Sequence, residues 1–140
     1  MDPDIQRRAE RTVAAARLQG AEIALIAMRP DGRVVALVGG RNWQPGAFNR
    51  VSQAKRQPGS TFKLFDYFAA FRAGARPDDV VIDAPIAVGD WRPANGYRGY
   101  RGPMTLRQAF AVSSNTAAVR IARAAGYREV VKAAHDLGIT

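Results

Sequence analysis

The segment Ser60–Phe71 constrains the fold most, because it places apolar side chains nearly all round a predicted helix. These side chains belong to Phe62, Leu64, Phe65, Phe68, Ala69 and Phe71. A helix without a polar face is stable only when neighbouring elements cover most of it. The chain has 140 residues, enough for one domain with a core that surrounds such a helix.

The residues before this helix predict another helix and a β-hairpin. Asp2 and Pro3 are typical of a helix start, and apolar residues then recur on one face until Gly20. Two β-prone runs, at 21–28 and 34–38, flank a Pro-Asp-Gly turn and therefore predict a hairpin. Residues 39–59 are expected to be irregular.

The residues after the apolar helix predict a long loop and then helices. Prolines and glycines recur through residues 75–104, so we expect an irregular segment there. Three helices are predicted to follow, at 105–112, 116–125 and 127–137. Because no repeat or linker divides the chain, residues 1–140 are predicted to form one domain.

Charge and composition exclude several classes of function. The formal net charge is +9, but the basic residues are scattered with acids between them, so we expect no nucleic acid as a partner. With no cysteine and one histidine, His135, the chain has no disulfide, thiolate or histidine-cluster metal site, and we expect no cofactor. No apolar run is long enough to cross a bilayer, and the acidic start is unlike a signal peptide.

Ser60 and Lys63 are candidate catalytic residues because they lie one turn apart at the start of the apolar helix. A lysine can take a proton from serine when desolvation keeps the amine neutral, and the first helical turn stabilises developing negative charge. The competing interpretation is a helix-capping serine with a surface lysine. A second Ser-x-x-Lys match begins at Ser52 and lacks a helix-start signal, so we regard it as a chance match.

Ser113 and Asn115 form a second candidate group, in the predicted break between two helices. A serine hydroxyl can relay a proton, and an asparagine amide can bind a substrate amide as donor and as acceptor. The simpler interpretation is a helix break in which Ser114 or Asn115 caps the following helix.

Two stretches together resemble the penicillin-binding proteins, specifically the transpeptidase domain of the bifunctional class A type. The first stretch is Phe48-Asn49-Arg50 with Ala54-Lys55-Arg56-Gln57-Pro58-Gly59-Ser60-Thr61-Phe62-Lys63. The second runs from Tyr100 to Ala109 and leads into Ser113-Ser114-Asn115. Asp2-Pro3-Asp4-Ile5-Gln6 and Val38-Gly39-Gly40 are also similar to the start of such domains, and Leu64 departs from the common proline.

The resemblance implies an α+β fold: an N-terminal helix and hairpin with the helical part of a β-lactamase/transpeptidase-like serine acyltransferase. It implies a D,D-transpeptidase in which Ser60 attacks the D-Ala-D-Ala end of a peptidoglycan stem peptide and is acylated by β-lactams. Lys63 would take the proton from Ser60, Ser113 would pass a proton to the leaving nitrogen, and Asn115 would orient Lys63 and the substrate. The parent protein would act at the extracytoplasmic face of the bacterial inner membrane, through an anchor outside this chain.

One family motif, Lys-Thr-Gly or Lys-Ser-Gly, does not occur in the sequence. We therefore expect a partial domain with an incomplete sheet and little transpeptidase activity of its own. Unpaired strand edges predict self-association. The alternative is a nonenzymatic cell-wall or β-lactam-sensing module, which would be acylated without turnover.

Overall fold

Six α-helices, one 3₁₀ helix and four short strands make up the computed structural model, which describes residues 1–139. These elements divide between two compact units, Met1–Gln57 and Pro58–Thr140. The strands form two separate two-stranded sheets, so the expected α+β fold with an incomplete sheet is confirmed. The assignment of all 140 residues to one partial transpeptidase domain stays a prediction, since one family domain can contain two compact units. None of the described helices is long and apolar enough to cross a membrane.

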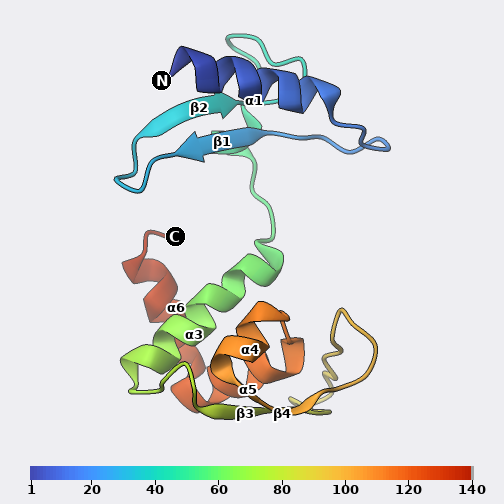
Figure 1. Cartoon of the computed structure of the whole chain (residues 1–140), viewed down its shortest axis with the longest axis vertical. Helices are drawn as coiled ribbons and strands as arrows, with labels where there is room; N and C mark the ends of the chain where they lie inside the picture. The colour runs from blue at the N-terminus through green and yellow to red at the C-terminus, as the bar shows by residue number, and fades with distance from the viewer. Residues whose placement is uncertain (140) are drawn as a thin grey trace. The chain divides into compact units, whose positions relative to one another are not determined.

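In the first unit, helix α1 (Pro3–Ala15) lies across the hairpin of β1 (Leu25–Met28) and β2 (Val34–Val38) (Figure 1). The Asp2 side chain caps α1 by accepting hydrogen bonds from the first backbone N–H groups, as predicted. The helix ends at Ala15 and not near Gly20 as predicted, because Val13 is its last buried residue and the chain then becomes extended.

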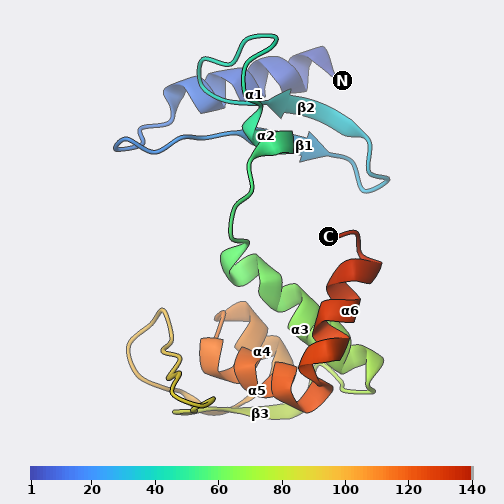
Figure 2. The same cartoon turned by 180° about the vertical axis from the view of Figure 1, so that it is seen from behind.

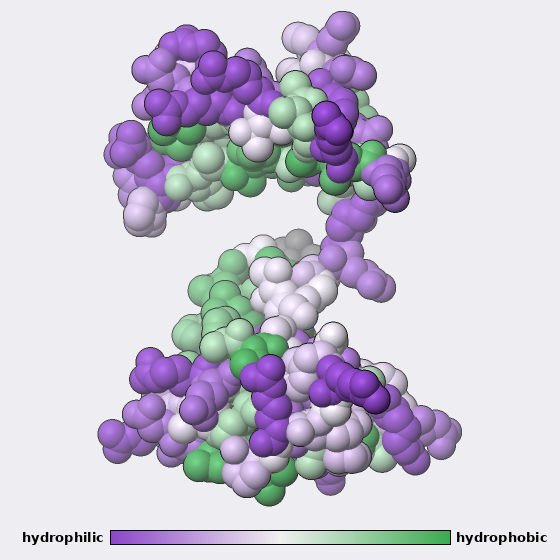
Figure 3. Space-filling model, turned by 45° about the vertical axis from the view of Figure 1, so that its right-hand side comes forward, coloured by the Kyte–Doolittle hydropathy of each residue, from purple (hydrophilic) through white to green (hydrophobic). Residues whose placement is uncertain are grey.

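Helix α1 covers only one face of the hairpin. Ala36 and Val38 are buried against the helix, whereas Ile26 and Met28 are exposed. Figure 3 shows apolar side chains gathered on the hairpin face that α1 leaves open. Self-association through the hairpin stays a prediction, and sedimentation analysis tests it: a monodisperse monomer would contradict it.

A one-turn helix, α2 (Arg50–Gln53), interrupts the segment that was predicted to be irregular.

In the second unit, a 3₁₀ turn (Gly59–Phe62) leads directly into α3 (Lys63–Arg72), which confirms the predicted apolar helix. Helix α3 packs against α5 (Asn115–Ala125) and lies beside α6 (Tyr127–Asp136), as Figure 2 shows from behind. Phe65, Tyr67, Ala69 and Ala70 are buried, but Leu64 is 50% exposed and Phe71 is 40% exposed. The expectation that this helix is covered on nearly all sides is therefore wrong for the described residues.

A sheet that the sequence did not predict lies within the supposed loop. Strand β3 (Val80–Asp83) pairs antiparallel with β4 (Gly102–Thr105). Pro103 is compatible with this sheet because a two-stranded sheet consists of edge strands, where a missing N–H costs little. The predicted capping box at Thr105 and Gln108 is confirmed, and it starts α4 (Leu106–Ala111).

Candidate functional site

The ammonium group of Lys63 is bound by Ser113. Lys63 is the first residue of α3 and is half-buried. Its Nζ donates hydrogen bonds to the Ser113 carbonyl oxygen at 2.6 Å and to Ser113 Oγ at 2.9 Å. The structure thus joins one residue from each of the two predicted motifs, although they lie 50 positions apart.

Ser113 has an unusual backbone conformation. Its φ of 54° makes it the one non-glycine residue with positive φ among residues 1–139. The Ser113 N–H binds the Phe110 carbonyl and the Ser114 N–H binds the Ala109 carbonyl, both at 3.0 Å. These two bonds form a Schellman cap at the end of α4, in which Ser113 takes the position that glycine usually occupies. This cap turns the carbonyl and hydroxyl of Ser113 towards Lys63.

Asn115 is the first residue of α5, and two hydrogen bonds tie it to the preceding loop. Its backbone N–H donates to Asn95 Oδ1 at 2.9 Å, and its side-chain Nδ2 donates to the Ala94 carbonyl at 2.6 Å. Ser114 caps α5 by accepting from the Ala117 N–H, which confirms that the turn also has the simpler capping role. In the part of the chain that the structure describes, no hydrogen bond joins Asn115 to Lys63.

Ser60 is exposed in the 3₁₀ turn that precedes α3. No hydrogen bond between described residues reaches its hydroxyl, and Lys63 is bound to Ser113 instead. The tight 3₁₀ geometry replaces the α-helical turn that the spacing of Ser60 and Lys63 suggested. The second Ser-x-x-Lys match differs further, because Ser52 lies in α2 and Lys55 lies in the segment after this helix.

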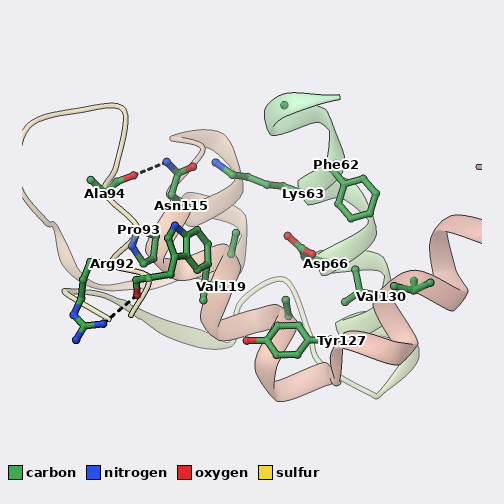
Figure 4. A pocket seen from close by; sticks show the side chains of 15 residues that line it. Phe62, Lys63, Asp66, Arg92, Pro93, Ala94, Asn115, Val119, Tyr127 and Val130 are labelled. Carbon is green, nitrogen blue, oxygen red and sulfur yellow. Dashed lines mark hydrogen bonds between the residues drawn. The ribbon is translucent and has the colours of Figure 1, made fainter. Parts of the chain in front are cut away.

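A cavity of about 630 Å³ adjoins the Lys63 side chain (Figure 4). This volume is typical of small-molecule sites. Its walls are largely apolar and come from the 3₁₀ turn Gly59–Phe62, α3, the loop before β4, α5 and α6. The lining includes Lys63, Asp66, Trp91, Arg92, Asn115, Val119, Tyr127 and Val130. Figure 4 shows Asn115 on the same side of the cavity as the amine of Lys63.

Burial changes the acid–base properties of two groups on α3. Desolvation lowers the pKa of Lys63, although the charge of Asp66 opposes this shift. Desolvation raises the pKa of Asp66 to about 6, and the nearby Lys63 charge limits the increase. The desolvation that was expected to favour a neutral lysine is therefore present at Lys63.

Sequence reasoning missed three polar residues of this region: Asp66, Asp83 and Asn95. Asp66 lines the cavity, whereas Asp83 and Asn95 accept hydrogen bonds from Ser114 and Asn115, which directly follow Ser113. Burial alone would raise the pKa of Asp83, but hydrogen bonds from Thr116, Tyr97, Asn95 and the Arg101 N–H together lower it below its ordinary value. One signal was available, since Asp83 is a single acid that follows the β-prone run Val80-Val81-Ile82.

Comparison with known proteins identifies the family. A family model described as "Penicillin binding protein transpeptidase domain" matches residues 23–140. Penicillin-binding protein 1A of Pseudomonas aeruginosa is 37% identical over 134 residues, which cover 91% of this chain and 16% of that protein. The namesake protein of Neisseria gonorrhoeae is 45% identical over 116 residues, which cover 78% of this chain and 14% of that protein. This chain thus spans a small part of the relatives it matches.

Solved structures agree with the sequence relatives. The crystal structure of penicillin-binding protein 1A from Haemophilus influenzae has a TM-score of 0.80 at 32% identity, covering 88% of this chain and 19% of that chain. The PonA1 protein of Mycobacterium tuberculosis in complex with penicillin V has a TM-score of 0.84 at 30% identity, covering 100% of this chain and 38% of that chain. The resemblance to the class A proteins is therefore confirmed, and this chain belongs to the penicillin-binding protein transpeptidase family.

Proposed function

We propose that this chain carries two catalytic motifs of a serine-type D,D-transpeptidase that cross-links peptidoglycan stem peptides. The observation that supports this best is the pair of hydrogen bonds from Lys63 to Ser113. They connect the Ser60-x-x-Lys63 and Ser113-x-Asn115 motifs beside a cavity that Asn115 also lines. A chance pair of motifs would have no reason to meet at such a cavity.

In the proposed first step, Ser60 Oγ attacks the penultimate D-Ala carbonyl and forms an ester bond. Lys63 accepts the proton of Ser60, which requires a neutral amine, and the desolvation that lowers the pKa of Lys63 favours this form. Since Lys63 is bound to Ser113 in the structure, a rotation of the Ser60 or Lys63 side chain must precede the attack.

The C–N bond to the terminal D-alanine then breaks, and D-alanine leaves with a proton that passes from Lys63 through Ser113 to its nitrogen. The hydrogen bond between Lys63 Nζ and Ser113 Oγ supports this proton path. The amine of a second stem peptide next attacks the ester, which forms the cross-link and restores the Ser60 hydroxyl. Asn115 orients the substrate, since its Nδ2 is bound to Ala94 and no hydrogen bond from residues 1–139 reaches its Oδ1, which can accept a substrate N–H.

We also propose that the 140 residues alone have little transpeptidase activity, because they contain no Lys-Thr-Gly or Lys-Ser-Gly sequence. The loss of one oxyanion-hole donor alone lowers kcat about 10²- to 10³-fold. In the parent protein this chemistry would take place at the extracytoplasmic face of the bacterial inner membrane, where peptidoglycan is the substrate.

Incubation with a fluorescent penicillin, followed by intact-mass measurement, tests the proposal. We expect one covalent adduct on the chain, its loss in Ser60→Ala and its retention in Ser52→Ala, the matched control from the second Ser-x-x-Lys sequence. An adduct that persists in Ser60→Ala, or no labelling at any incubation time, would contradict the proposal.

A second assay separates the enzyme from the sensing module. It measures the release of D-alanine from a D-Ala-D-Ala peptide in the presence of an acceptor amine. The 140 residues alone are expected to release little D-alanine, so the assay uses a longer protein that also contains a Lys-Thr-Gly or Lys-Ser-Gly motif. Adduct formation at Ser60 without any D-alanine release by that longer protein would favour the nonenzymatic β-lactam-sensing module.

A further inference from the structure

Asp83 is a buried carboxylate at the centre of a hydrogen-bond network. It is the last residue of β3, and its exposed fraction is 0%. Its Oδ1 accepts hydrogen bonds from Asn95 Nδ2 at 2.8 Å, from Ser114 Oγ at 3.0 Å and from Thr116 Oγ1. Its Oδ2 accepts from Tyr97 OH at 2.6 Å and from the Arg101 N–H at 2.9 Å.

These donors come from the two segments that frame the candidate site, the loop before β4 and the start of α5. No cation lies within salt-bridge distance of Asp83 among residues 1–139. The carboxylate charge is instead balanced by these donors and by the positive end of the α5 dipole. An ionised carboxylate has only acceptor atoms, so it can bind all of these donors at once. A neutral amide of the same shape could not.

The first link from Asp83 to the site passes through Ser114. Ser114 is fully buried, donates to Asp83 and accepts from the Ala117 N–H, so its position is fixed from two sides. It directly follows Ser113, whose positive φ is unfavourable for serine. A residue in such a conformation stays there only when its surroundings hold it. The Schellman cap of α4 holds Ser113 on one side, and Asp83 holds it through Ser114 on the other.

The second link passes through Asn95. Because Asn95 Nδ2 donates to Asp83, Asn95 Oδ1 points towards α5. There it accepts from the backbone N–H groups of Asn115 at 2.9 Å and Thr116 at 3.3 Å. Asp83 thus determines which way the Asn95 amide points, and Asn95 in turn locates Asn115.

We propose that Asp83 is a positioning residue of this site, which orients Ser113 through Ser114 and Asn115 through Asn95. It touches neither of these two side chains and none of the proposed reacting atoms. This role rests on the proposed function, but the position of Ser113 relative to Lys63 can be measured without any catalysis.

The experiment removes each link separately, because Asp83→Asn disturbs the fold as well as the site. Ser114→Ala removes the first link, together with the Ser114 cap on the Ala117 N–H and a 3.4 Å hydrogen bond from Ser114 Oγ to Asn95 Oδ1. Asn95→Ala removes the second link and leaves the hydrogen bond from Ser114 to Asp83 in place. Ile121→Val is the matched control, since this buried side chain of α5 lies in the core cluster and takes no part in the hydrogen-bond network of Asp83, and its truncation also lowers stability. All three substitutions are made in the full 140-residue chain.

The first measurement is an NMR pH titration of the chain labelled with ¹³C-lysine. The sequence contains only Lys55, Lys63 and Lys132, so single Lys→Arg variants assign each resonance. Hydrogen bonds that an ammonium group donates favour its charged form and raise its pKa, so a displaced Ser113 lowers the pKa of Lys63 further. We expect this decrease in Ser114→Ala, a smaller one in Asn95→Ala, and none in Ile121→Val.

The second measurement is the rate of penicillin acylation at Ser60. Misplacement of positioning groups by about 1 Å lowers rates by up to about 100-fold, and we expect about a 10-fold decrease for each link variant. If both link variants fold and match Ile121→Val in Lys63 titration and in rate, Asp83 is only structural and the proposal is wrong. If the unsubstituted 140-residue chain is never acylated, the proposed function fails, but the Lys63 titration still decides the role of Asp83.

Discussion

Ser60 and Ser113 both belong to the candidate site, yet the chain holds them in very different ways. Ser113 lies in a strained turn between a helix cap and a residue bound to the buried Asp83, and it accepts both hydrogen bonds from Lys63. Ser60 is exposed in a 3₁₀ turn, and no hydrogen bond from the described residues reaches its hydroxyl. One part of the site is therefore already held in a defined arrangement, whereas the proposed nucleophile is not.

Two aspartates of this region differ in a similar way, Asp66 beside Lys63 and Asp83 bound to Ser114. Asp66 and Asp83 both lose solvent on folding, which by itself raises the pKa of each carboxyl. Asp83 receives several hydrogen bonds, and its pKa falls below the ordinary value. Asp66 receives none from the described residues, and its pKa rises to about 6. The number of hydrogen-bond donors, more than burial, therefore decides whether each carboxyl is ionised near neutral pH. Asp83, with several donors, stays charged, whereas Asp66, with none from the described residues, gains and loses its proton near pH 6.

The largest expected effect is the loss of stability in Asp83→Asn. The asparagine amide would direct its own N–H groups at hydrogen-bond donors, and buried polar groups would lose their partner. The cost is expected to be at least about 3 kcal/mol in the free energy of unfolding. Chemical denaturation monitored by circular dichroism at pH 7 measures it.

The pH dependence provides a check on this assignment. Because the folded-state pKa of Asp83 lies below its unfolded value near 3.8, its stabilisation is complete at neutral pH and declines as the pH falls below about 4. The difference in free energy of unfolding between the unsubstituted chain and Asp83→Asn should therefore decrease as the pH falls below about 4. Equal stability of the two proteins at pH 7 would show that the carboxylate is not required.

A smaller effect, with opposite signs for stability and activity, is expected for Ser113→Gly. Glycine adopts positive φ without strain, so the substitution should increase the free energy of unfolding by about 1 kcal/mol. It also removes the hydroxyl that binds Lys63, so penicillin acylation at Ser60 should slow markedly. Ser113→Ala is the control, since it removes the hydroxyl but retains the strain.

Ser60→Ala is expected to affect acylation but not stability, unlike the substitutions of Ser113. An exposed serine without a hydrogen-bond partner contributes within about 0.5 kcal/mol to stability. We therefore expect Ser60→Ala to abolish acylation without a change in the unfolding midpoint. Stabilisation by Ser113→Ala as large as that by Ser113→Gly would show that backbone strain at Ser113 is not the cause.

The sequence predicted well the features that depend on neighbouring residues. The cap at Asp2, the capping box at Thr105 and Gln108, and the apolar helix that begins near Ser60 are confirmed because their signals lie within one or two turns. The end of α1 was wrong because an apolar periodicity does not reveal where the buried face stops.

Features that depend on distant residues could not be predicted in the same way. Strand β3 was missed because its partner β4 contains Gly102 and Pro103, both poor local signals for a strand. The network of Asp83 was missed for a related reason, since its donors follow it by 12 to 33 positions. Likewise, the spacing of Ser60 and Lys63 suggested a hydrogen bond between these two neighbours, whereas Lys63 binds Ser113, which lies 50 positions later.

The smallest stability change that we expect to be measurable concerns Asp66→Asn, and it sharpens the contrast between the two aspartates. Because folding raises the pKa of the Asp66 carboxyl, the protonated form of Asp66 favours the folded state and the charged form does not. The unsubstituted chain therefore loses stability relative to Asp66→Asn as the pH rises from 4 to 7. After allowance for solvent screening of a half-buried group, the relative change is about 0.5–1 kcal/mol. Urea denaturation of both proteins across this pH range measures it, with Asp90→Asn, an exposed aspartate of the same unit, as the control.

The charge of Asp66 also opposes the lowered pKa of Lys63, so Asp66→Asn should lower the pKa of Lys63 further in the ¹³C-lysine titration. If the stability difference does not change between pH 4 and 7, or changes equally in Asp90→Asn, Asp66 does not titrate as a buried group and the Lys63 side of the site has no such dependence on pH.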